Sequence, residues 1–208
     1  MTTLLELTSQ ISTRLLDENN ADVSSSDIKE ALNDALSFYK KKHFYFNEEF
    51  TTVTLVTDNP EVTNFPTDYQ KPLEGFCSIF YSQQYWKVTK VLPSIYDAEN
   101  IQGKGIPYII TERAGKWYVY FIPDQDYTMQ LYYLKDYAAL QDDSDTNDFT
   151  EEAPALMRYD ALSRLYGELK QDEKMEAYYT ARAQAEFDVL KQQTQSRQRT
   201  GYLEIEQI

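Results

Sequence analysis

The hydrophobic pattern of the chain changes twice, from a helical period to a strand-like alternation after Asn47 and back to a helical period at Pro154. One element type cannot satisfy both periods, so the chain must combine helices with a β-rich middle. We therefore expect an α+β protein with a four-helix body (two N-terminal and two C-terminal helices), a central antiparallel β insert and an extended C-terminal arm. The expected limits are 1–47 and 141–193 for the helical body, 48–140 for the insert and 194–208 for the arm.

Four stretches carry the helical period, and the first two open with capping patterns. Thr3 precedes Glu6, and Ser24 precedes Asp27, by the three residues that a capping box requires. The expected helices span 3–16, 24–42, 154–170 and 172–193. Apolar residues at spacings of three and four form their buried faces, with an expected core of Leu7, Ile11, Leu32, Leu36, Leu162 and Leu165.

The middle of the chain holds several short runs of β-branched and aromatic residues. The expected strands are 50–57, 75–81, 86–91, 108–112, 116–122 and 128–134. The break at Ala114-Gly115 predicts a hairpin between two of them. No connection between these runs carries a pattern for a helix long enough to serve as a crossover, so we expect antiparallel and not parallel pairing.

The charge of the chain is strongly acidic, with 34 acidic against 20 basic residues and a formal net charge of -14. Such a surface repels phosphates, which argues against a protein that grips nucleic acid. The single cysteine, Cys77, cannot form a disulfide within the chain, and no apolar run approaches the roughly 20 residues of a membrane span. The N-terminal residues also lack the pattern of a secretory signal, so we expect a soluble protein of a reducing compartment.

Residues suited to catalysis or metal binding are scarce. One histidine, His43, and one cysteine cannot build a usual zinc site, and no local motif marks a nucleophile. Asp143, Asp145 and Asn147 resemble the start of a calcium loop, but Asp148 takes the place of the required glycine and Pro154 the place of the final glutamate. We expect no enzyme activity, no cofactor and no dedicated metal site, while weak cation binding by the acidic loop 142–152 stays open.

The order of the elements resembles that of the head-to-tail adaptor (connector, head completion) proteins of tailed bacteriophages, especially those of short-tailed phages. Local motifs agree over nearly the whole chain, and their shared order carries the resemblance. The matching stretches are Ser24 to Leu32, Phe65-Pro-Thr-Asp-Tyr69, Gly105-Ile-Pro-Tyr108, Ile122-Pro123 with Leu131 and Tyr133, Asn147-Asp-Phe149, Pro154 to Tyr159, and Tyr178-Tyr179.

The resemblance implies a structural part of the virion and not an enzyme. It implies a twelve-fold ring beneath the portal protein of the capsid, contacting the portal, neighbouring adaptor subunits and a tail or nozzle protein. DNA would pass through this channel without specific binding, and no membrane would be involved. Assembly would take place in the host cytoplasm. An acidic lumen suits this role, because it repels the DNA backbone.

The C-terminal arm is the expected docking segment. Apolar residues alternate with polar ones beyond Gly201, which is the period of a strand that adds to an exposed sheet edge. The basic residues ahead of it suit an acidic partner surface. The candidate residues for docking on the portal or on a neighbouring subunit are Arg197, Arg199, Tyr202, Leu203, Ile205 and Ile208. The alternative is a strand that completes the chain's own β insert.

Three other functions stay open. A tail-completion or stopper protein of a phage would share the acidic character and the lack of catalytic motifs. A binding module for a peptide or a sugar would use the 18 tyrosines of the chain in a concave aromatic patch. A hydrolase that relies on carboxylates alone fits least, because no polar cluster is evident.

Overall fold

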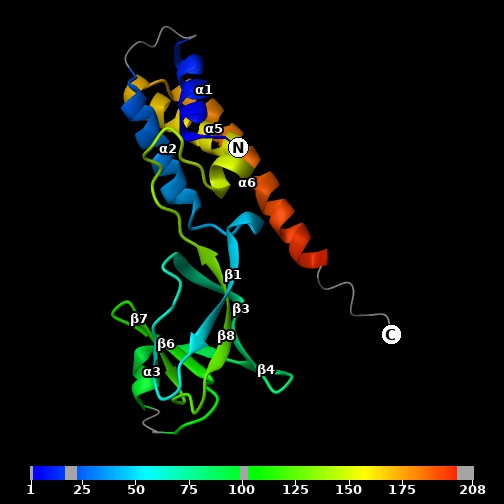
Figure 1. Ribbon diagram of the computed structural model, residues 1–208. Helices are drawn as coiled ribbons and strands as arrows, with labels where there is room; N and C mark the ends of the chain where they lie inside the picture. The colour runs from blue at the N-terminus through cyan, green and yellow to red at the C-terminus, as the bar shows by residue number, and fades with distance from the viewer. Residues whose placement is uncertain (1, 17–22, 99–102, 201–208) are drawn as a thin grey trace. The chain divides into compact units, whose positions relative to one another are not determined.

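A computed structural model describes residues 2–16, 23–98 and 103–200 of the chain. It divides the chain into a helical unit, Met1–Asn47 with Asp136–Ile208, and a β unit, Glu48–Lys135 (Figure 1). The α+β class expected from the sequence is confirmed. Residues 136–140, expected in the β insert, belong to the helical unit, because Tyr137 and Leu140 are buried in its core.

Capping boxes start the first two helices of the helical unit, α1 (Leu4–Leu16) and α2 (Ser25–Tyr39). The backbone N–H of Glu6 donates to Thr3 Oγ1 at 3.2 Å, and the backbone N–H of Asp27 donates to Ser24 Oγ at 3.2 Å. Each bond satisfies a donor that the first turn of a helix leaves without an intrahelical partner. Both helix starts therefore follow the sequence prediction.

Three further α-helices and a π-helical turn of this unit follow the β unit in the chain. They are α4 (Asp148–Glu152), α5 (Pro154–Leu165), the π-helical turn η2 (Tyr166–Lys170) and α6 (Glu173–Thr200). The short helix α4 lies in a stretch that we expected to be a solvated loop, so the expected four-helix body is incomplete. Asn147 caps α4 by accepting the backbone N–H of Thr150 at 3.0 Å. Phe149 then packs fully buried in the core.

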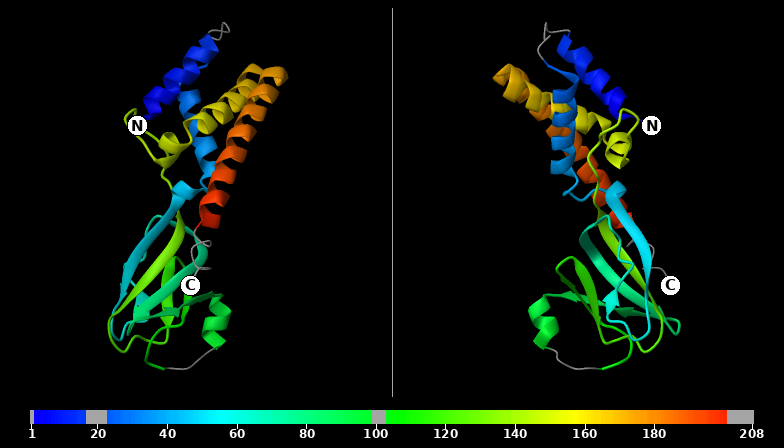
Figure 2. Two further views of the ribbon diagram at one scale, coloured as in Figure 1. Left: turned by 90° about the vertical axis from the view of Figure 1, so that its right-hand side faces the viewer. Right: turned by 60° about the vertical axis from the view of Figure 1, so that its left-hand side comes forward.

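A single apolar core holds the helical unit together. The helices α2 and α6 both contact α5, and α6 is the long orange-to-red helix beside it in Figure 2. Every core residue expected from the sequence is buried, in agreement with the helical spacing. Residues that contribute large or fully buried side chains to this core include Leu7, Ile11, Leu32, Leu36, Phe44, Phe149, Leu156, Leu162, Leu165 and Tyr166.

Two four-stranded sheets form the β unit. The first sheet has the order β1-β8-β3-β4, made of β1 (Glu48–Leu55), β8 (Tyr127–Lys135), β3 (Tyr69–Tyr81) and β4 (Gln84–Lys87). All its neighbouring strands are antiparallel. Ser82 and Gln83 join β3 to β4, and both have positive φ, as a two-residue type I′ hairpin requires.

The second sheet has the order β2-β7-β6-β5. Its strands are β2 (Glu61–Val62), β7 (Lys116–Tyr120), β6 (Ile109–Arg113) and β5 (Thr89–Val91). The predicted hairpin at Ala114-Gly115 joins β6 to β7 and is confirmed. The expectation of purely antiparallel pairing is wrong for β5 and β6, which are parallel. Their connection contains the helix α3 (Pro93–Ala98), which is not among the helices expected from the sequence.

The core of the β unit lies between the inward faces of these two sheets. Alternate residues of β8 from Tyr127 to Tyr133 are buried and those between them are more exposed, as expected for a sheet covered on one face. The core residues are Val53, Leu55, Val62, Cys77, Ile79, Val88, Ile110, Trp117, Val119, Tyr127, Met129, Leu131 and Tyr133.

Candidate functional site

The end of helix α6 contains the first two residues of the expected docking set. Arg197 and Arg199 lie inside α6, which continues to Thr200. The prediction of an extended arm that begins at residue 194 is therefore wrong. The helix continues because the stretch before Gly201 contains no glycine or proline that would end it. Tyr202, Leu203, Ile205 and Ile208 lie outside the described residues.

Thr194 attaches this part of α6 to the turn η1 (Tyr45–Asn47). The buried hydroxyl of Thr194 donates to the carbonyl oxygen of Leu190 at 2.9 Å and accepts the backbone N–H of Tyr45 at 3.1 Å. One turn further along the helix, Cζ of Arg197 lies 3.6 Å from the centre of the Tyr45 ring. This stacked geometry adds a cation–π attraction to the hydrogen bond.

The side chain of Tyr45 also contacts a residue of α4. Its hydroxyl donates to Oε2 of Glu152 at 2.7 Å. Partial burial, and then the hydrogen bond to Glu152, raise the pKa of Tyr45, while the charge of Arg197 acts in the opposite direction. Tyr45 therefore remains a neutral hydrogen-bond donor that links α4 to α6.

A groove of about 230 Å³ lies beside Tyr45, between α5 and α6. Pro154, Ala155 and Leu156 form one wall, and Val189, which is 49% exposed, lies on the other. The carboxylates of Glu152 and Glu186 complete the lining, as do Leu190 and Gln193. The lining of this groove is therefore mainly apolar, with two acidic residues.

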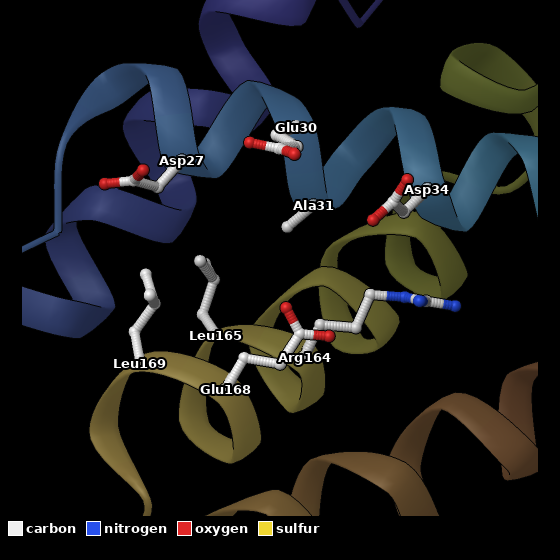
Figure 3. A pocket seen from close by; sticks show the side chains of 8 residues that line it. All are labelled: Asp27, Glu30, Ala31, Asp34, Arg164, Leu165, Glu168 and Leu169. Carbon is white, nitrogen blue, oxygen red and sulfur yellow. The ribbon is translucent and has the colours of Figure 1, made fainter.

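A second groove, of about 110 Å³, lies between α2 and the end of α5 (Figure 3). Asp27, Glu30 and Asp34 line its α2 side, and Arg164 and Glu168 lie opposite. Nε of Arg164 donates to Asp160 Oδ2 at 2.7 Å, so this cation is engaged within its own helix. Hydrogen bonds from Ser24 lower the pKa of Asp27 and keep that carboxylate charged. The groove therefore repels phosphate and favours cationic side chains.

The acidic stretch before α4 is engaged in local structure. Asp145 Oδ2 accepts the backbone N–H groups of Gln141 and Asp142 at 2.7 and 2.9 Å, and Asp143 forms an ion pair with Lys29 at 2.7 Å. These bonds fix a turn that leads into α4. Within the described residues, no group of three or more acidic, histidine or cysteine side chains is arranged to hold a metal ion.

The single histidine and the single cysteine of the chain lie in different units. His43 is half-buried near the end of α2, whereas Cys77 is buried in the β unit. Burial raises the pKa of the Cys77 thiol to about 12, so the thiolate that a nucleophile needs is scarce at neutral pH.

The described helices include none that is long and apolar enough to cross a membrane.

Comparison with known proteins points to one family. A family model described as "SU10 adaptor protein" matches residues 2–204, which include both units and the whole of α6. No curated protein matches the chain.

Proposed function

This chain belongs to the SU10 adaptor protein family, and on that basis we propose that it is a structural head-to-tail adaptor of a tailed bacteriophage. In this role it forms a twelve-fold ring beneath the portal, links the capsid to a tail or nozzle protein and continues the DNA channel. It assembles in the host cytoplasm and remains in the virion. The match over residues 2–204 is the observation that carries the proposal.

The acidic character of the chain supports a channel through which DNA slides. A net charge of -14 per subunit, with carboxylates collected along the groove of Figure 3, disfavours contact with the phosphate backbone. In a lumen of this kind negative charge predominates, so the genome is not retained. The adaptor thus acts mechanically, by connecting and guiding, and catalyses no reaction.

The docking segment of the proposed adaptor begins at the end of α6. Because Thr194 and Tyr45 fix the helix up to Arg197, residues beyond this point have a rigid base from which to reach a partner. We assign docking on the portal, or on a neighbouring subunit, to Arg199 and the segment 201–208. Leu203, Ile205 and Ile208 supply the apolar contacts of that segment.

Electron microscopy of the full chain mixed with its cognate portal tests this function, and a ring on the portal is the expected result. Loss of binding in a chain that lacks residues 201–208, with an unchanged melting temperature, would assign docking to this segment. A lower melting temperature would instead indicate a strand that completes the chain's own fold.

A matched pair of variants separates the two faces of the segment. The double substitution Leu203→Ser with Ile205→Ser removes the apolar face, and we expect it to abolish portal binding. The control, Glu204→Gln with Glu206→Gln, alters the opposite face and should retain binding. Full occupancy of the portal by the serine variant would exclude a docking role for this segment.

A further inference from the structure

The two edges of the first sheet of the β unit are exposed. In the order β1-β8-β3-β4, the strands β1 and β4 are the outer ones. All four residues of β4 are exposed, and β1 has no buried residue before Val53. Edge strands offer backbone N–H and C=O groups to any strand that lies alongside, and proteins usually cover or blunt them.

The directions of the strands make these two edges compatible with each other. Each neighbouring pair in the sheet is antiparallel, so β1 and β4, separated by two strands, also run in opposite directions. Subunits of a cyclic ring meet through two different surfaces and keep the same orientation relative to the ring axis. The β4 strand of one copy therefore meets the β1 strand of the next in the antiparallel sense, which is the more stable pairing.

One register aligns the side chains of the two edges. Strand pairing within the sheet places Val53 opposite Met129, Met129 opposite Ile79, and Ile79 opposite Trp86. These residues define the inward face of the sheet. Because side chains alternate along a strand, Glu48 and Phe50 of β1, like Tyr85 and Lys87 of β4, belong to the outward face. Their spacing is two residues in both strands.

We propose that β4 of one copy pairs with β1 of the next copy, with Gln84–Lys87 opposite Glu48–Thr51, so that neighbouring sheets become continuous. Tyr85 then lies opposite Phe50 of the next copy, and Lys87 lies opposite its Glu48. This inference rests on the ring that we propose above and specifies a contact through which its subunits recognise each other.

The aromatic residues on the outward face support this register. Within one copy, Tyr85 contacts Phe80 with ring centres 4.9 Å apart, and Phe50 contacts Tyr132 at 4.8 Å. These four rings are between 41% and 67% exposed. The proposed pairing joins both contacts into one aromatic row across the junction and removes these rings from water.

Charge favours pairing between unlike edges. Lys87 and Glu48 attract each other across the junction, whereas β1 contains no basic residue that could pair with Glu48 or Glu49 of a second β1 strand. Pairing of β1 with itself therefore gains no ion pair. The charges favour the head-to-tail contact that a closed ring needs.

Cysteine cross-linking of the full chain tests the register. In the variant Thr51→Cys with Gln84→Cys, the two new thiols face each other across the junction. We expect a ladder of covalent multimers on non-reducing gels once rings have formed on the cognate portal or at high ionic strength. The control, Thr52→Cys with Gln84→Cys, places the thiols on opposite faces and should give no ladder. Cys77 is buried and should remain reduced in both variants.

The outcomes separate this inference from the proposed function. Rings without a ladder from the first variant would overturn the strand pairing and leave the adaptor function intact. That result would also follow if another segment, such as residues 202–206, occupied the β4 edge. Absence of rings under every condition, including on the portal, would overturn the proposed function itself.

Charge reversal provides a second test of the same contact. Glu48→Lys and Lys87→Glu should each weaken self-association roughly two- to fivefold per interface, which is the range for a cross-strand charge pair. The double variant should restore it. The melting temperature of each monomer is measured in parallel, so that a loss of association is distinguished from a loss of folding. Failure of the double variant to recover association would contradict the proposed register.

Discussion

The guanidinium of Arg197 stacks on the ring of Tyr45, with Cζ 3.6 Å from the ring centre. Tyr45 belongs to the short turn that precedes the β unit, and Arg197 to the last turn of α6. The contact joins the helix that ends the described chain to the segment from which the β unit starts. The residues around it are therefore sensitive positions for stability.

Thr194 should be important for stability because its buried hydroxyl serves two backbone groups. In Thr194→Val the side chain keeps its shape, but the backbone N–H of Tyr45 loses its acceptor. We expect a loss of about 1–3 kcal/mol in the free energy of unfolding, which is typical when a buried polar group is left without a partner. Urea denaturation measures this loss. Thr54→Val, at an exposed position of β1, is the control and should change little.

Truncation of leucines in the helical core should lower the stability of the protein. Leu32 and Leu162 are both fully buried, and Leu32→Ala or Leu162→Ala should each lower the free energy of unfolding by about 2–5 kcal/mol. Leu5, which is 53% exposed on α1, provides the matched control, and Leu5→Ala should have a small effect. Denaturant midpoints that were equal in the three variants would contradict the assignment of the core.

Stability should fall at alkaline pH because the fold favours neutral tyrosines. Burial, and then the charge of Asp160, raise the pKa of Tyr39, and burial also raises the pKa of Tyr69 and Tyr133. The stabilisation is fully present below the unfolded pKa of about 10 and is lost as the pH rises toward the higher folded values. Urea midpoints between about pH 8 and pH 11, a range that spans the reference pKa of tyrosine, measure the decline in stability. Tyr39→Phe should show a shallower decline relative to its own value at pH 8.

Assembly should depend on ionic strength and on the portal. With a net charge of -14 per subunit, we expect self-repulsion to keep the free protein monomeric at low salt. Added salt screens the repulsion and should promote rings, and the portal should template them. Light scattering at low and high salt measures the mass directly. A stable closed ring at low salt without the portal would contradict the templating role.

The sequence predicted most helices because their signals are local. The capping boxes at Thr3 and Ser24, and leucines at helical spacing, depend on residues only three or four positions apart. The same spacing continues through Thr194 and Arg197, so the length of α6 was predictable, but the polar composition of that stretch concealed it. The helix α4 was concealed in the same way by the acidic residues around Phe149.

The arrangement of strands was less predictable because it depends on distant partners. The run 86–91 reads as one strand, yet it is divided between two sheets at Val88, whose backbone N–H donates to the carbonyl oxygen of Cys77 at 3.0 Å. Alternation specifies the two faces of a strand but not its neighbours. For the same reason, the contact between Tyr45 and Arg197 could not be inferred from either segment alone.

The first and last strands of the β unit are direct neighbours, with Glu48 opposite Leu134. A folded unit whose two ends lie side by side can take the place of one short connection in the helical unit. Its insertion therefore costs the helical unit little conformational freedom. Such a unit can be exchanged, enlarged or lost during evolution without a change in the helices on either side.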